Sequence, residues 1–200
     1  MCPEGYRGPP RQPDVRAPQY DPDFESWAAP FIMAAINTRI VQRSNALSKQ
    51  AYGADFLYDE GMLTGRGLRG RAAATALAVG LPAVMVAGSI GPLRSALERY
   101  VLPKPGEGPS VAAQEKGFWD VRLVGRTRAG QVLRVKVTGD RDPGYGSTAK
   151  MLGQAAACLA LDLGHDRKQG GFWTPATLLG DRLVERLRSH SGVTFEVLEN

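Results

Sequence analysis

The segment from Ala72 to Leu93 contains no charged residue, and arginines flank it at Arg71 and Arg94. At roughly 20 residues it reaches the length of a membrane span. It is rich in alanine and interrupted by Pro82 and Pro92, so its hydrophobicity is modest for insertion. We therefore expect an apolar helical segment over 72–93, buried as a hairpin or at a subunit interface. A true span and a helix lying at the bilayer surface remain as alternatives.

The overall composition is typical of a globular protein with many turns, because 43% of the residues are hydrophobic and 24 are glycine. The net charge of +5 is scattered, so we expect no nucleic-acid partner, whereas acidic lipid or phosphate would be attracted. Cys2 and Cys158 lie far apart, which favours a reduced protein. With a polar, Pro-rich beginning and no secretory signal, the expected location is cytoplasmic, or peripheral to the inner face of the membrane.

The pattern predicts two regions. Residues 1–22 are rich in Pro, Arg and Asp, so we expect a disordered or draped N-terminal arm, followed by one domain over 23–200. Within it, Pro30–Lys49 predicts a helix with Pro30 in its first turn and isoleucines on one face. Another face carries Asn37, Arg39, Gln42 and Arg43, which form either a solvated face or a polar seam against a ligand or another domain.

The second half of the chain alternates strands and helices. Lys116–Val124 and Gln131–Val137 alternate polar and apolar residues and predict an antiparallel hairpin. Thr148–Leu163 predicts a buried helix, and Thr174 caps an amphipathic helix that begins at Pro175. Val193–Leu198 predicts a last strand. The expected fold class is α/β (α+β), a mixed, partly antiparallel sheet with covering helices.

The glycines after the predicted hairpin match a nucleotide-binding pattern. Gly144, Gly146 and Ala149 fit G-x-G-x-x-G/A, which places a pyrophosphate on a helix N-terminus. The hairpin context disfavours a parallel β-α-β unit, and Asp162 falls within or at the end of the helix rather than after a second strand. The structural alternative is a Pro-Gly turn before a helix capped by Ser147 or Thr148. An intermediate alternative is that free N–H groups there, near Lys150, hold a substrate phosphate or carboxylate.

Local chemistry gives the candidate site residues. The expected catalytic groups are His165, Tyr145 and Lys150; a histidine after a buried helix acts as an acid/base or simply as a helix cap. The expected substrate-binding residues are Asn37, Arg39, Arg43, Ser147, Thr148 and Trp173. Two histidines and two separated cysteines give no metal-ligand cluster, so no metal is expected.

Several segments in order resemble a known family. They are Ala35–Arg39 with Arg43–Leu47, Pro103–Ser110 with Lys116–Trp119, Gly144–Met151, and Gly170–Ala176. Over roughly 20–199 the chain resembles the C-terminal part of the saccharopine dehydrogenase-like oxidoreductases, and most closely the mycobacterial trans-acting enoyl reductases. The motifs are specific in combination, although each is short.

The resemblance implies a substrate or assembly domain whose NADP-binding Rossmann half lies outside this sequence, truncated or separately encoded. NADP(H) is then the implied cofactor, but its binding loop is absent from this chain. We therefore do not expect this chain to be active without the NADP-binding half. The implied reaction is enoyl reduction in the synthesis of phthiocerol- or phenolphthiocerol-type polyketide lipids. The implied substrate is a lipid or acyl chain, the implied partner is a polyketide synthase, and the protein is expected to form a homo-oligomer. The alternatives are a non-enzymatic membrane-associated or scaffold module, suggested by the apolar segment, and an inactive relic.

Overall fold

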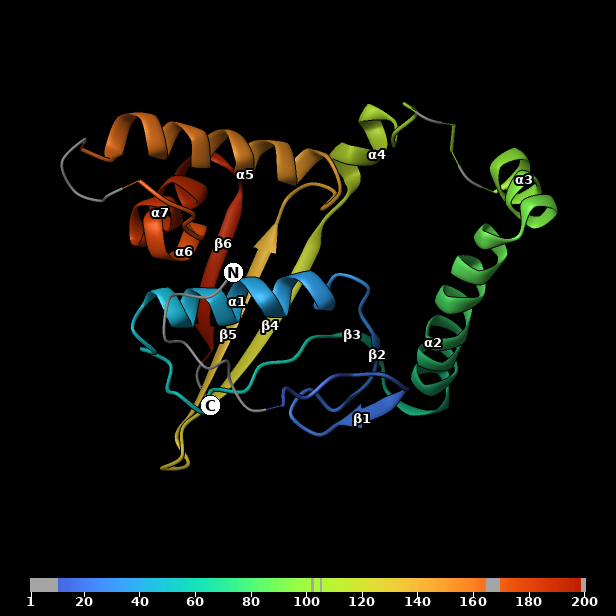
Figure 1. Cartoon of the computed structure of the whole chain (residues 1–200), viewed down its shortest axis with the longest axis horizontal. Helices are drawn as coiled ribbons and strands as arrows, with labels where there is room; N and C mark the ends of the chain where they lie inside the picture. Colours follow the sequence, from blue (N-terminus) through green and yellow to red (C-terminus); the bar gives the residue numbers. More distant parts are fainter. Residues whose placement is uncertain (1–10, 102, 105, 165–169, 199–200) are drawn as a thin grey trace. The chain divides into compact units, whose positions relative to one another are not determined.

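The computed structural model describes residues 11–101, 103–104, 106–164 and 170–198. The chain forms two compact units, Met1–Pro105 and Gly106–Asn200. Each unit has its own three-stranded sheet, with strand orders β1-β2-β3 and β4-β5-β6 (Figure 1). A boundary between units therefore falls inside the range 23–200, because each sheet is completed within its own half of the chain.

The first unit begins with a small antiparallel sheet. Its strands are β1 (Gln19–Asp21), β2 (Ser26–Pro30) and β3 (Gly61–Gly65). Ala28 and Ala29 of the central strand are buried, as is Val15 before the sheet. The first ten residues of the expected N-terminal arm lie outside the described residues. From Arg11 onward the arm packs on this unit, because Val15 is buried there.

The first long helix is oriented with its polar face inward. Helix α1 (Ala34–Leu47) begins after Pro30, which ends β2, so the prediction of Pro30 in the first helical turn is wrong. Ile36 and Ile40 are exposed, whereas Gln42 and Asn45 are buried. The side of α1 that carries Gln42 and Asn45 is thus the inner one, whereas the isoleucines and Arg39 are exposed.

The uncharged segment forms one continuous helix. Helix α2 (Gly67–Ser89) includes Pro82 without a break and is followed by α3 (Gly91–Tyr100). Its first turns pack on β2 and β3, where Gly70 and Ala74 are buried (Figure 1). By length and composition α2 could cross a membrane, and only 6% of its most apolar stretch is buried. The expected burial as a hairpin within the chain is therefore wrong.

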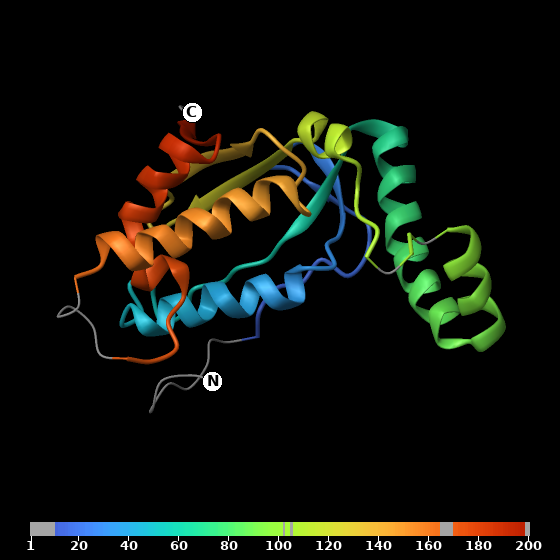
Figure 2. The ribbon, with the colours of Figure 1, turned by 90° about the horizontal axis from the view of Figure 1, so that it is seen from above.

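The second unit has the predicted strands and helices in order, with α4 (Val111–Lys116) in addition, but the helix expected to be buried over Thr148–Leu163 exposes Leu152 and Leu161. Its elements are α4 (Val111–Lys116), β4 (Trp119–Arg126), β5 (Val132–Gly139), α5 (Gly146–Ala157), the π-helix η1 (Cys158–Asp162), α6 (Pro175–Leu178), α7 (Gly180–His190) and β6 (Val193–Leu198). The hairpin pairs Val121 with Val137, and β6 joins β5 antiparallel. Helix α7 packs against both α5 and β6. Figure 2 shows α7 alongside α5.

The fold class is confirmed, with three differences in detail. All strand pairs of the described residues are antiparallel rather than mixed. Lys116 ends α4, which the Ser110 hydroxyl caps by accepting from the Ala113 N–H, so the first strand begins only at Trp119. Thr174 caps the helix at Pro175 as predicted, but that helix is interrupted at Leu179, before α7 begins at Gly180 with a φ of +53°.

Candidate functional site

The N-terminus of α5 is capped by a carboxylate from the preceding loop. Oδ1 of Asp142 accepts hydrogen bonds from the N–H groups of Gly144 (3.1 Å) and Tyr145 (3.0 Å). Oδ2 accepts from the N–H of Gly146 at 2.7 Å. These bonds, the Gly146 bond foremost, hold the pKa of Asp142 below its ordinary value. The N–H groups expected to be free for a phosphate are therefore occupied, and that expectation is wrong.

The two residues predicted as helix caps make other contacts. The Ser147 hydroxyl, fully buried, accepts a 2.8 Å hydrogen bond from Nε1 of Trp119. The Thr148 hydroxyl donates to the carbonyl of Pro143 at 2.6 Å. Gly139 lies under the indole, since a Cβ there would be 2.1 Å from Trp119 Nε1. The first turn of α5 is thus fastened to the sheet through Trp119.

Two of the three expected catalytic residues share the first turns of α5. Nζ of Lys150 donates to both carboxylate oxygens of Asp140, at 2.8 and 2.9 Å. Tyr145 is exposed, and only its main chain is bound to Asp142. The third, His165, lies outside the described residues. Tyr145 and Lys150 thus both lie at the start of α5, and Asp140 balances the charge of the lysine.

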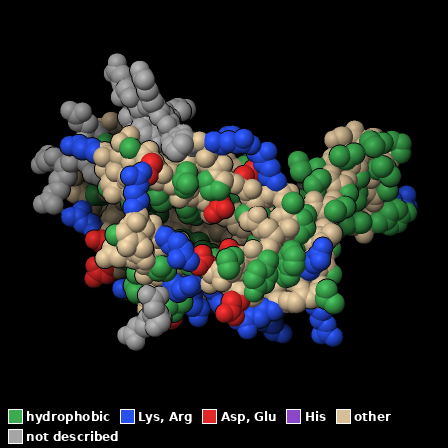
Figure 3. Space-filling view, turned by 90° about the horizontal axis from the view of Figure 1, so that it is seen from below, with side chains coloured by type: hydrophobic (Ala, Val, Ile, Leu, Met, Phe, Trp, Pro, Cys, Tyr) green, Lys and Arg blue, Asp and Glu red, His purple; other side chains and the backbone are tan. Residues whose placement is uncertain are grey.

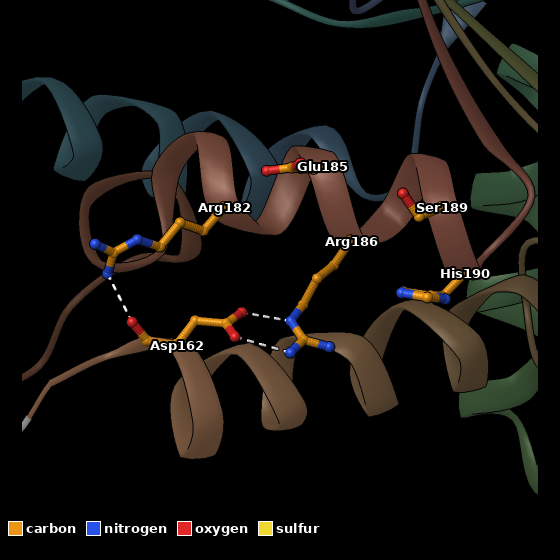
Figure 4. Close-up of a pocket in the computed structure, with 6 residues that line it drawn as sticks. All are labelled: Asp162, Arg182, Glu185, Arg186, Ser189 and His190. Carbon is orange, nitrogen blue, oxygen red and sulfur yellow. Dashed lines mark hydrogen bonds and ion pairs between the residues drawn. The ribbon is translucent and has the colours of Figure 1, made fainter.

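A separate pocket of about 380 Å³ lies between η1 and α7 (Figure 4). Its lining residues are Asp162, Arg182, Glu185, Arg186, Ser189 and His190. Arg186 forms a bidentate ion pair with the Asp162 carboxylate: Nε donates to Oδ2, and Nη2 donates to Oδ1 at 2.8 Å. Nη1 of Arg182 donates to the main-chain carbonyl of Asp162 at 2.8 Å. Because charged side chains form its walls, this pocket suits a polar group rather than an acyl chain.

The ion pair sets the protonation of the groups around it. Hydrogen bonding from Arg186 lowers the pKa of Asp162 to about 2. Cys158, fully buried one turn earlier, has its pKa raised by burial and then by its contact with Asp162. Burial thus disfavours the thiolate form of Cys158. Across the described ranges, no group of three or more His, Cys, Asp or Glu residues could hold a metal ion.

The expected substrate-binding residues on α1 lie in the first unit. Nδ2 of Asn37 donates to Glu60 Oε2 at 2.9 Å, and the Tyr58 hydroxyl donates to Oε1 at 2.8 Å. Burial, and then the bond to Glu60, raises the pKa of Tyr58. Arg39 is exposed and Arg43 is half-buried. Asn37 is thus part of a structural polar network, while Arg39 presents its charge at the surface.

Trp173, the remaining expected substrate contact, is half-buried just before α6 in the second unit. The residues that sequence reasoning missed are Asp142, Asp140 and Arg186. Asp142-Pro-Gly144 is itself a turn signal, because an Asp side chain bonds N–H groups two or more residues ahead. Nothing in the spacing of Asp162 and Arg186 indicates their pairing, since it depends on how η1 packs on α7.

Together, these elements define a protein of mixed helices and strands with two small antiparallel sheets. In the second unit, the Asp142 carboxylate caps the N-terminus of α5. No family model and no solved structure matches the chain. Among curated proteins, it is 38% identical to a Mycobacterium tuberculosis H37Rv protein named as a trans-acting enoyl reductase, over 92% of this chain and 45% of the relative. The trans-acting enoyl reductase of Mycobacterium bovis BCG is 39% identical over 88% of this chain and 43% of its own length.

A third relative, the trans-acting enoyl reductase of Mycobacterium ulcerans, is 38% identical over 80% of this chain and 39% of its own length. The chain is therefore homologous to mycobacterial trans-acting enoyl reductases over about nine tenths of its sequence. It spans less than half the length of these relatives.

Proposed function

We propose that this chain forms part of an oxidoreductase that reduces an enoyl double bond in trans. The observation that carries the proposal is its identity of 38–39% to proteins named trans-acting enoyl reductase, over most of the chain. In this proposal the described residues provide a scaffold and the surface facing the substrate. They correspond to the C-terminal part of a saccharopine dehydrogenase-like enzyme.

NADPH is the proposed hydride donor, bound by a region other than the glycines before α5. The Asp142 carboxylate supports this division, because it occupies the N–H groups that would otherwise meet a pyrophosphate. A dinucleotide entering there would also meet the negative charge of Asp142. Hydride transfer would then depend on a nucleotide-binding part that works together with this chain.

The proposed substrates are acyl chains of phthiocerol- and phenolphthiocerol-type lipids, presented by a polyketide synthase. The family resemblance supports this choice, and an enzyme acting in trans needs a partner that carries the acyl chain. We further propose that the protein works as a homo-oligomer, in the cytoplasm or at the inner face of the membrane.

A chimeric enzyme tests the proposal. The segment of the Mycobacterium bovis relative that aligns with this chain is replaced by this chain, and NADPH oxidation is followed with an enoyl thioester. We expect NADPH-dependent reduction by the chimera. A chimera that folds and binds NADPH but does not reduce the double bond would contradict the proposed function. Separately, tight binding of NADPH by the present chain alone would contradict the proposed division of labour.

Within the chimera, Tyr145 and Lys150 are the proposed catalytic pair on this chain. Tyr145→Phe removes a hydroxyl from an exposed ring, and Lys150→Met removes the charge that Asp140 balances. Each is expected to lower kcat with little change in NADPH affinity. Lys116→Met, at the exposed end of α4, is the matched control. Unchanged turnover in both variants would leave the start of α5 with a structural role only.

A further inference from the structure

Helix α2 exposes a large apolar surface. Val79, Met85 and Val86 are 65%, 64% and 62% exposed. Further exposed apolar side chains on α2 and just beyond it are Leu68, Leu77, Val84, Ile90 and Leu93. In the space-filling view the part formed by α2 and α3, at the right, is covered mainly by hydrophobic side chains (Figure 3). Exposed apolar area of this size marks a surface that another phase or molecule covers.

The helix is held firmly at one end only. Gly70 and Ala74 pack on the sheet of the first unit, and the Thr64 hydroxyl donates to the Gly70 carbonyl at 2.9 Å. Gly70 approaches the chain so closely that a Cβ would lie 2.1 Å from the Gly65 carbonyl oxygen. Beyond these turns, α2 contacts chiefly α3 among the described elements. The apolar part is thus presented outward from a fixed base.

The apolar residues surround the helix rather than forming one stripe. Val79 and Val86 are seven residues apart and share a side of the helix, because two turns take about 7 residues. Leu77 and Val84 share a second side, about 200° away at about 100° per residue. All four are exposed. A second protein helix would cover one side and leave the other in water, whereas acyl chains cover both.

Arginine–aromatic pairs stand at both ends of the apolar run. At its beginning the guanidinium of Arg71 lies 5.3 Å from the ring centre of Trp27. Beyond its end the guanidinium of Arg99 lies 5.5 Å from the ring centre of Tyr100. Tyr, Trp and basic residues are the side chains that occupy the headgroup level of a membrane. Arg69 adds an exposed positive charge at the first end.

The length fits the same environment. The 23 residues of α2 extend ~35 Å at 1.5 Å per residue, and the hydrocarbon core of a bilayer is about 30 Å thick. We propose that α2 embeds in a lipid bilayer with anionic headgroups, with acyl chains covering its apolar surface and the arginines of both ends at the headgroups. This inference stands apart from the reductase chemistry and concerns where the protein works.

Vesicle flotation of the full chain tests the proposal. We expect the protein to float with vesicles of phosphatidylcholine and phosphatidylglycerol. Val79→Asp combined with Val86→Asp, both at exposed positions, is expected to lower the partition coefficient more than about tenfold, because aspartate is costly among acyl chains. Val111→Asp, at an exposed position in α4, is the matched control and should float like the parent. Circular dichroism checks that each variant keeps its helices.

The charge contribution is tested with Arg69→Gln and Arg99→Gln. Each is expected to weaken binding to the anionic vesicles about fivefold, since a basic residue near an anionic surface contributes about 1 kcal/mol. Binding to vesicles of phosphatidylcholine alone should change little. Equal weakening on both vesicle types would contradict the headgroup role of the arginines.

Two results would overturn the membrane proposal. One is a parent protein that stays at the bottom of the gradient with both vesicle types. The other is a dimer in sedimentation experiments that the Val79→Asp, Val86→Asp variant dissociates, with no flotation, which would assign the helix to a second copy of the chain. Neither result alters the outcome of the chimera experiment, so the two proposals fail separately.

Discussion

The main-chain N–H of Gly146 donates a 2.7 Å hydrogen bond to Oδ2 of Asp142, four residues earlier. The bond places a carboxylate at the helix start that the glycine pattern would assign to a phosphate. Negative charge at a helix N-terminus is favourable, and here the chain itself supplies it. The glycines therefore serve a close approach between loop and helix, since a Cβ on Gly146 would lie 2.8 Å from that same oxygen.

Asp142→Asn is expected to destabilise the second unit at neutral pH. Because the folded pKa of Asp142 lies below its ordinary value, the ionised carboxylate adds stability above the unfolded pKa of about 3.9. That contribution is lost as pH falls through the lower folded pKa. Urea unfolding at neutral and acidic pH should show a difference between parent and variant that shrinks in acid. Glu196→Gln, on β6, is the control, and a pH-independent difference would contradict the explanation.

Gly139→Ala is expected to displace the Trp119 indole. The new methyl group would lie 2.1 Å from Nε1, so the ring must move and its bond to Ser147 is lost. Overpacking of this kind costs about 1–3 kcal/mol. Tryptophan fluorescence and urea unfolding measure both effects. Gly125→Ala in β4, where the added Cβ meets nothing within 4 Å, is the matched control. Equal stabilities of the two variants would show that Trp119 is not fixed there.

Asn45→Ala is expected to destabilise the first unit by about 2 kcal/mol, because it leaves two main-chain groups without their partner. Asn45 is 1% exposed; its Nδ2 donates to the Gly53 carbonyl, and its Oδ1 accepts from the Tyr52 N–H, both at 2.9 Å. Ile36→Ala on the outer face of α1 should change the free energy of unfolding far less. A larger loss from Ile36→Ala would mean that the isoleucine face is buried in solution.

Arg186→Gln is expected to raise the pKa of Asp162 from about 2 toward the ordinary value of about 3.9. In the parent, the ion pair adds stability above that ordinary value and loses it as pH falls toward the folded pKa. Carboxyl-carbon NMR titration measures the shift. Arg182→Gln, which loses a bond only to the main-chain carbonyl of Asp162, should move the pKa less. An unchanged pKa in Arg186→Gln would exclude the ion pair in solution.

The strands of the second unit could be predicted because one-in-two alternation reflects a sheet with two different faces. The β4–β5 hairpin, the strand Val193–Leu198 and the Thr174 cap follow from such local rules. The orientation of α1 could not, because Asn45 is satisfied by the loop at Tyr52 and Gly53, whose path no helical pattern reveals. The expected phosphate or carboxylate site at the start of α5 was wrong for the same reason. The glycine spacing does not show which acceptor binds the first N–H groups of the helix, and here it is Asp142.

The inward polar face of α1 also determines how this helix can be aligned. Apolar contacts are non-directional, so they define the position of a helix less strictly than hydrogen bonds do. Asn45 does not tolerate a shift of one turn, since both ends of its amide meet main-chain groups at fixed places. A displaced α1 would leave those groups buried and unbonded, at about 1–3 kcal/mol each. The first unit thereby gains a single alignment of helix and loop, and tolerance of substitution should be concentrated on its isoleucine side.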